Sequence, residues 1–266
     1  MLVAIDVGNT NIVMGVYKDR KRLFHFRVAT SAEKSRDEYG LLFIQLLGNR
    51  GVKREDIDGV IISSVVPPVM YSLERAVKDY LGQTPIVVTN DMNLGMDILY
   101  ENPKEVGADR LVNAVAAIKR HGAPAIIVDF GTATTFCAVN EKGQYLGGAI
   151  CPGIKISVEA LFSRTAKLPR IELVPTDRII GRSTVESMQA GVIHGYAGQV
   201  DYIVKLMKEE MNCPDARVIA TGGLASMISR EATSIDTIDG MLTLDGLLEI
   251  YEMQKPKERT ITNELQ

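Results

Sequence analysis

Two short stretches of the sequence have residue types that bind phosphate groups and metal ions. The first is Asp6-Val7-Gly8-Asn9-Thr10-Asn11, which lies between two apolar runs and therefore predicts two strands joined by a tight turn. Gly8 would let the backbone approach a ligand, and successive N–H groups in such a turn can form an anion-binding concavity. Asp6 could hold Mg²⁺ through oxygen or water contacts. On this stretch alone an ordinary hairpin is the alternative, with Asp6 and Asn9 serving only the turn.

The second stretch repeats the first one half a chain later. An apolar run from residue 125 ends in Asp129-Phe130-Gly131-Thr132, and further hydroxyl residues and another apolar run follow. Internal repetition of this kind is a signature of the architecture of the whole chain. Two matching corners, one in each half, predict two similar domains that face a shared nucleotide cleft.

A third motif, Gly107-Ala108-Asp109-Arg110, precedes a predicted helix over residues 111–119. An Asp at this place is a common helix N-cap, and position alone favours that structural role. A phosphoryl transfer to an alcohol also needs a carboxylate that accepts the hydroxyl proton. Arg110 could hold a substrate carboxylate in a bidentate pair, which a lysine would do less well.

Composition and charge exclude several classes of protein. The chain has 266 residues and a formal net charge of −3, which argues against a nucleic-acid-binding surface. Its apolar runs are too short to span a membrane, and the first predicted strand leaves no room for a signal peptide. Cys137, Cys151 and Cys213 lack the spacing of a disulfide framework or a zinc site. We therefore expect a cytoplasmic protein that binds neither nucleic acid nor membrane.

The predicted elements occur in a similar order in both halves, as an α/β fold would require. In the first half we expect strands at 2–7, 12–17, 22–28, 60–66 and 86–89, with helices after the capping box Ser35 to Glu38 and after Pro67. In the second half we expect strands from 125, at 136–139, 144–151 and 217–220, with helices near 154–163, 184–211 and 243–253.

The domain boundary is predicted near residues 117–124, where Lys119 to Pro124 interrupts the pattern. This gives an N-terminal domain over residues 1–118 and a C-terminal domain over residues 119–254. Residues 255–266 are polar and without periodicity, which predicts a loose tail.

Together with a later Gly-Gly turn, Thr221-Gly222-Gly223-Leu224-Ala225, the paired corners resemble the acetate/sugar kinase, Hsc70 and actin superfamily. The two corners, the Gly107 to Arg110 motif and the Gly-Gly turn, in this order, are similar to type III pantothenate kinases. The resemblance extends to about residue 250. It implies two ribonuclease-H-like domains with the nucleotide cleft between them. It also implies phosphorylation of pantothenate by ATP to 4′-phosphopantothenate, the first step towards coenzyme A.

The resemblance assigns a role to each matching position. ATP would be bound by Asp6, Val7, Gly8, Asn9, Thr10, Asn11, Ile12, Val13 and Thr132, with Asp6 on the Mg²⁺ that accompanies it. Pantothenate would be bound by Tyr100, Gly107, Ala108, Asp109 and Arg110, and by Thr184 from the partner subunit. Asp109 would be the general base, and Asp129 would hold K⁺ or NH₄⁺. Many members carry an Asp where this chain has Cys137, a position to which no catalytic role is attached here.

Residues 184–211 form a long predicted helix with apolar residues at helical spacing, which either packs within the chain or covers a second copy. The resemblance favours a homodimer. Two rival functions stay open: a kinase of the same fold that phosphorylates another small alcohol, and a non-catalytic accessory factor for transcription. Arg110 argues against a neutral sugar as the substrate, because a sugar has no carboxylate for it. The complete set of Asp6, Asp109 and Asp129 argues against a non-catalytic binding protein.

Overall fold

The computed structural model describes residues 1–255, and nearly all of the predicted polar tail, 255–266, lies outside this range. The first half forms a five-stranded sheet in the order β3-β2-β1-β4-β5. β1 pairs antiparallel with β2 and parallel with β4. The strands are β1 (Leu2–Val7), β2 (Asn11–Lys18), β3 (Lys21–Ala29), β4 (Gly59–Ser64) and β5 (Ile86–Val87).

The second half repeats this topology in a sheet of order β10-β9-β6-β7-β8. β6 takes the place of β1, because it pairs antiparallel with β7 and parallel with β9. The strands are β6 (Ala125–Phe130), β7 (Ala133–Val139), β8 (Tyr145–Pro152), β9 (Arg217–Gly222) and β10 (Thr237–Ile238). The expected pair of similar α/β units is therefore confirmed, although β10 had no counterpart among the predicted strands.

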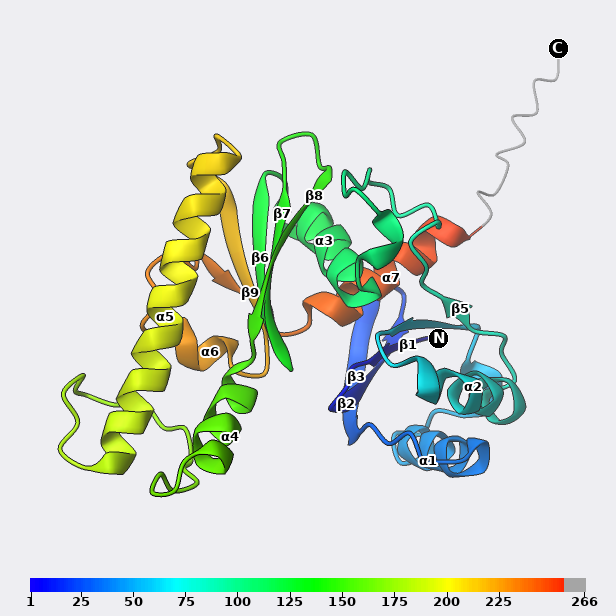
Figure 1. Cartoon of the computed structure of the whole chain (residues 1–266). Coiled ribbons are helices and arrows are strands. Elements are labelled where there is room, and N and C mark those ends of the chain that lie inside the picture. Colours follow the sequence, from blue (N-terminus) through cyan, green and yellow to red (C-terminus); the bar gives the residue numbers. More distant parts are fainter. Residues whose placement is uncertain (256–266) are drawn as a thin grey trace, which may run out of the picture.

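Helices cover both faces of both sheets, which gives five layers (Figure 1). α1 (Arg36–Gly48) and α2 (Pro67–Ala76) lie on the outer face of the first sheet, where one core cluster is buried. α4 (Ile154–Arg164), α5 (Thr184–Glu210) and α6 (Ala225–Ile228) cover the outer face of the second sheet over another cluster. α3 (Ala108–His121) and α7 (Leu242–Gln254) fill the space between the sheets.

The local signals behind these elements act as the sequence suggests. Ser35 caps α1, and the Glu38 side chain closes the capping box. Pro67 starts α2, which continues after Ala76 as a π-helical turn over Val77–Leu81. The central strands β1, β4 and β6 are buried almost throughout, as expected of strands with helices on both faces of the sheet.

α3 and α7 join the two halves. α7 comes last in the chain but packs on β1, β2 and β4 of the first sheet, and α3 packs on α7, on β4 and on β6 and β7 of the second. The buried carboxylate of Asp245 on α7 accepts hydrogen bonds from Tyr17 (2.6 Å), Arg22 (3.0 Å) and Arg120 (2.6 Å). The domain boundary placed near residues 117–124 stays a prediction.

Within residues 1–255, none of the helices combines the length and the apolar character that crossing a membrane requires.

Candidate active site

A cleft of about 450 Å³ lies where the two sheets converge. It is lined by both Asp-x-Gly corners, by the start of α3, and by the Gly-Gly turn after β9. The first turn of α4 and the start of α7 complete the wall. The carboxyl ends of parallel strands are where open α/β sheets bind their ligands, and β1 and β6 both end here.

The two corners are similar turns that meet across the cleft, and the second is one residue shorter. The Gly8 N–H donates to the Asn11 carbonyl at 3.0 Å, and the Gly131 N–H donates to the Ala133 carbonyl at 3.1 Å. The hydroxyl oxygens of Thr10 and Thr132 lie 3.0 Å apart, so the turns of the two halves are in direct contact. An anion placed between them would meet backbone and hydroxyl donors from both sides.

Three carboxylates, those of Asp6, Asp109 and Asp129, line this cleft, and their surroundings disfavour the ionised forms. Burial, with the charges of Asp109 and Asp129 adding to it, raises the pKa of Asp6 to about 8. Burial and the charge of Asp109 raise the pKa of Asp129 to about 7, and burial also raises the pKa of Asp109. Like charges in a desolvated site cannot all ionise without a compensating cation.

No group of three or more His, Cys, Asp or Glu side chains within residues 1–255 is arranged to hold a metal ion alone. The cleft therefore suits a divalent ion that is held by one carboxylate and otherwise by water and substrate phosphates. The oxygen-rich corners suit Mg²⁺ and K⁺ and do not suit a transition metal.

A hydrogen-bond line from α7 through α3 fixes Asp129. The Asn113 side-chain amide donates to Asp129 at 3.1 Å, and its own oxygen accepts from the Thr243 hydroxyl at 2.7 Å. Sequence analysis missed Asn113. Helical spacing could have found it, because it lies four residues after Asp109 on one face of α3.

Asp109 lies inside the first turn of α3, with Gly107 at the N-cap position, so the expectation of an Asp directly before the helix needs correction. Its Oδ1 accepts the backbone N–H of Arg110 at 2.8 Å. A Cβ on Gly107 would lie 2.6 Å from that oxygen, so glycine is required to leave room for the carboxylate.

Arg110 is only 7% exposed as a residue, and its guanidinium has no carboxylate partner within residues 1–255. Its Nε donates to the Cys137 sulfur at 3.2 Å, and the group lies 5.9 Å from the centre of the Tyr145 ring. Burial raises the pKa of the Cys137 thiol, which keeps this acceptor neutral and weak. Nη2 is buried with no hydrogen-bond acceptor among the described residues.

Gly222 shapes the cleft on the side of the second sheet. Its φ is +92°, and a Cβ there would lie 2.6 Å from Asp129 Oδ1. Only glycine satisfies both the backbone angle and the close approach. The Gly-Gly turn is thereby held directly against the second corner.

The remaining expected site residues divide into two groups. Val7 and Ile12 are buried in the outer core of the first half, and Ala108 is buried in the central core, so none of these three residues lines the cleft. Tyr100 packs beside Gly147 and Thr184 begins α5, and neither lines the cleft of this chain.

Several further residues line the cleft that sequence analysis did not single out. Arg27, Thr135 and Ile150 come from strands in register with Asp6 or Asp129, directly or through one intervening residue, a signal that becomes readable only once strand pairing is known. The others lie in or next to helices; they are Glu105, Lys155, Ile156, Met241 and Thr243.

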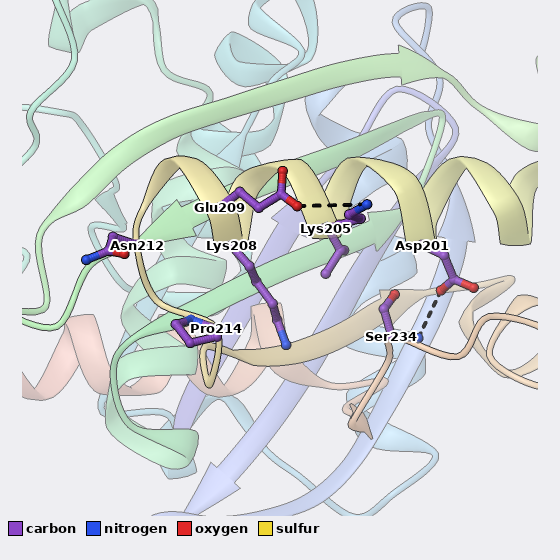
Figure 2. A pocket seen from close by; sticks show the side chains of 8 residues that line it. Asp201, Lys205, Lys208, Glu209, Asn212, Pro214 and Ser234 are labelled. Carbon is purple, nitrogen blue, oxygen red and sulfur yellow. Dashed lines mark hydrogen bonds and ion pairs between the residues drawn. The ribbon is translucent and has the colours of Figure 1, made fainter.

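A second hollow, of about 560 Å³, lies beside the C-terminal part of α5 (Figure 2). Two of its charged side chains, Asp201 and Lys205, are engaged in local contacts. Asp201 accepts from the backbone N–H groups of Thr233 and Ser234, and Lys205 pairs with Glu209 at 3.9 Å. No set of residues there resembles the paired corners, so the chemistry belongs to the first cleft.

The sequence profile of the type III pantothenate kinases matches residues 2–206, which include both corners, Asp109, Arg110 and Thr184. The chain belongs to this family. Membership makes it a kinase that binds ATP and a small substrate.

Solved structures with the same fold include kinases of other small molecules. A Sinorhizobium meliloti protein described as a 2-dehydro-3-deoxygalactonokinase aligns over 98% of this chain and 99% of its own, at 9% identity and a TM-score of 0.59. An inorganic polyphosphate/ATP-glucomannokinase from Arthrobacter sp. strain KM aligns over 95% and 98%, at 14% identity and a TM-score of 0.51.

A Campylobacter jejuni protein described as a Baf family transcriptional activator aligns over 94% of this chain and 98% of its own, at 17% identity and a TM-score of 0.55. At these identities the likeness shows the fold alone. It is the two-domain actin-like and sugar-kinase fold expected from the repeated corners.

The raised pKa of Asp129 predicts a pH-dependent effect of Asp129→Asn on stability in buffer without divalent or potassium ions. The folded state holds this proton up to about pH 7, whereas the unfolded state loses it near the ordinary aspartate pKa of 3.8, so stability falls as the pH rises between these values. The advantage in melting temperature of the variant over the wild type should therefore grow from pH 4 to pH 7 and then level off.

Asp215→Asn is the matched control, because Asp215 is exposed. Its melting temperature should follow that of the wild type across the same series. A constant difference between Asp129→Asn and the wild type from pH 4 to pH 8 would contradict the raised pKa.

Proposed function

We propose that this protein transfers the γ-phosphoryl group of ATP to the primary hydroxyl of pantothenate and forms 4′-phosphopantothenate for coenzyme A synthesis. The observation that carries the proposal is the buried Arg110 guanidinium, whose Nη2 lacks an acceptor among the described residues and which adjoins Asp109 in the cleft. Pantothenate has a carboxylate for the first group and a hydroxyl for the second.

Arg110 selects for an anionic acceptor. A buried cation without a counter-ion is costly, and a bidentate carboxylate would offset that cost. A neutral sugar brings no such charge, so a sugar kinase of this fold would not need the arrangement. The wall opposite is partly apolar, with Ile150 and Ile156, which suits the gem-dimethyl part of pantothenate.

Asp109 acts as the general base. Its raised pKa brings it closer to neutrality, where a base accepts a proton more effectively, and the cleft supplies no histidine for this task. Arg110 and Asp109 are consecutive, so a substrate held at one end by its carboxylate is oriented relative to the base.

Asp6 would hold Mg²⁺ together with the phosphates, and Asp129 would hold K⁺ or NH₄⁺. These ions would supply the positive charge that three carboxylates and a polyphosphate need in one cleft. The protein itself contributes the hydroxyl groups of Thr10 and Thr132 at the two corners, which would position the phosphate tail.

A non-catalytic role in transcription has support only from the description of the Campylobacter jejuni protein. The complete set of acidic groups in the cleft and the acidic balance of the chain favour catalysis over DNA binding.

We expect ADP release that depends on pantothenate, measured by a coupled assay with a panel of neutral sugars and pantothenol as comparison acceptors. Asp109→Asn should lower kcat by roughly 10²–10⁴, the usual range for loss of a general base. The fold should persist, because an amide oxygen can still accept the Arg110 N–H.

Glu105→Gln is the control, since Glu105 also lines the cleft but bonds to Asn102. It should keep most of the activity. Near-normal turnover of Asp109→Asn would show that Asp109 has only a structural role. Equal use of pantothenol and pantothenate would show that Arg110 does not select for a substrate carboxylate.

The cation assignment predicts that replacing Na⁺ by K⁺ at constant ionic strength raises both activity and melting temperature. An ion that binds only the folded state stabilises it by an amount that grows with the logarithm of the ion concentration above its Kd. The shift in melting temperature should vanish in Asp129→Asn. Equal rates and equal melting temperatures in the two salts would refute a monovalent cation at Asp129.

We also propose a homodimer in which Thr184 completes the site of the opposite subunit. Most of the apolar face of α5 is covered by its own chain, including Met188, Val192 and Val200, so the helix pattern alone does not support a second copy. Support comes instead from the segment that leads into α5, where Ile179 and Ile180 are 63% and 81% exposed. Thr184 lies just beyond them and outside the cleft of its own chain.

A mixture of Asp109→Asn and Thr184→Arg proteins tests this arrangement after exchange of subunits. In a mixed dimer one composite site collects both defects and the other has none, so activity should recover to at most about one quarter of the wild type if subunits mix at random. If mass measurement proves exchange and no activity returns, each site is built from a single chain.

A further inference from the structure

Arg27 on β3 is the residue from which a further role can be inferred. In the strand register Asp6 pairs with Val13 of β2, and Val13 pairs with Arg27 of β3. Paired residues of neighbouring strands point to the same face of a sheet. Arg27 therefore lies in one row with Asp6, on the face that borders the cleft, and it lines the cleft.

The guanidinium of Arg27 reaches from the first half to the second. Its Nη1 lies 3.8 Å from the position that a Cβ of Gly223 would take, next to the Gly-Gly turn. Its charge also lowers the pKa of Asp6, which places it within electrostatic range of that carboxylate. It makes no side-chain hydrogen bond or ion pair of its own within residues 1–255.

Other basic groups near the site are differently placed. Arg110 belongs to the opposite side of the cleft, with Cys137 and Tyr145. Arg22, on the same strand as Arg27, is paired with Asp245. Lys155 lines the cleft from α4 of the second half. Arg27 is thus the cation that the first sheet contributes to the cleft.

The two sheets differ at this position. In the second sheet Asp129 pairs with Thr135, and Thr135 pairs with Ile150, so Ile150 occupies the place that Arg27 has in the first. At this equivalent position the first sheet therefore has a guanidinium and the second sheet has an apolar side chain. This asymmetry gives the cleft a polar end, suited to a polyphosphate, beside the first corner.

We propose that Arg27 binds the phosphate tail of ATP and neutralises the charge that develops on the leaving ADP. The inference rests on the proposed kinase function and adds a residue to it. In the transfer, the acceptor hydroxyl oxygen bonds to the γ-phosphorus and its proton passes to Asp109. The bond from that phosphorus to the β–γ bridging oxygen breaks, and the electron pair stays on that oxygen. A planar guanidinium can contact two phosphate oxygens at once during this step.

The test compares Arg27→Gln and Arg27→Lys with the charge-matched control Lys21→Gln, which removes an exposed cation from the same strand outside the cleft. Binding of Mg-ATP, Mg-ADP and adenosine is measured by calorimetry without an acceptor, and kcat is measured with pantothenate. Arg27→Gln should weaken ATP and ADP binding by about tenfold, leave adenosine binding unchanged, and lower kcat by about 10²–10³, the loss typical of removing one transition-state donor.

Compared with Arg27→Gln, Arg27→Lys should recover part of the nucleotide affinity but little of kcat. A lysine keeps the positive charge but cannot contact two phosphate oxygens in the planar geometry of a guanidinium. Lys21→Gln should match the wild type in every measurement. Unchanged ATP affinity and kcat in a folded Arg27→Gln protein would overturn the proposal, and so would an equal loss of adenosine binding. Because binding is measured without acceptor, the result for Arg27 stands even if another alcohol replaces pantothenate as the substrate.

Discussion

Mutual repulsion among Asp6, Asp109 and Asp129 is the constraint on which the site depends. The three carboxylates come from two sheets and one connecting helix, and they are brought together in a desolvated cleft where at least two of their pKa values rise to neutrality or above. Such a cluster lowers the stability of the folded protein when all its members ionise. It becomes favourable when cations and a bound substrate compensate the charge, and this ties the stability of the cleft to its occupation.

The scaffold must therefore hold these groups against their own repulsion. α3 and α7 do so by packing between the sheets and by carrying the hydrogen-bond line from Thr243 through Asn113 to Asp129. In the same first turn of α7, Asp245 accepts hydrogen bonds from Tyr17, Arg22 and Arg120, so first-sheet strands and both helices share one buried acceptor. The last helix of the chain thus packs on the first sheet while it supports, through Thr243 and Asn113, a carboxylate of the second.

Positive charge is distributed in the cleft so that its two ends differ. Arg110, buried and with an unpartnered Nη2 among the described residues, marks the end suited to a carboxylate. Arg27, at the opposite end of the row from Asp6, marks the end suited to a phosphate tail. The two halves of the cleft therefore differ in charge although their strand topology is repeated, because the equivalent of Arg27 in the second sheet is Ile150.

The sequence alone determined the elements and the two corners. Strand and helix periodicity, the Ser35 capping box and the Asp-x-Gly turns depend on neighbours within a few residues, and the structure has each of them close to the expected positions. Asp109 and Arg110 were also identifiable, since consecutive acidic and basic side chains at the start of a predicted helix form a local pattern. The family match over residues 2–206 agrees with that local information.

Only the tertiary structure decided what these residues face. That Asp109 lies in the first turn of α3, that Asn113 holds Asp129, and that Arg110 has no carboxylate partner among the described residues depend on how α3 packs between two sheets. The placement of Arg27 in one row with Asp6 depends on two strand pairings, β1 with β2 and β2 with β3, and on the register of each. Periodicity gives the face of a strand but not its neighbours, and the charge balance of a buried cleft is set by those neighbours.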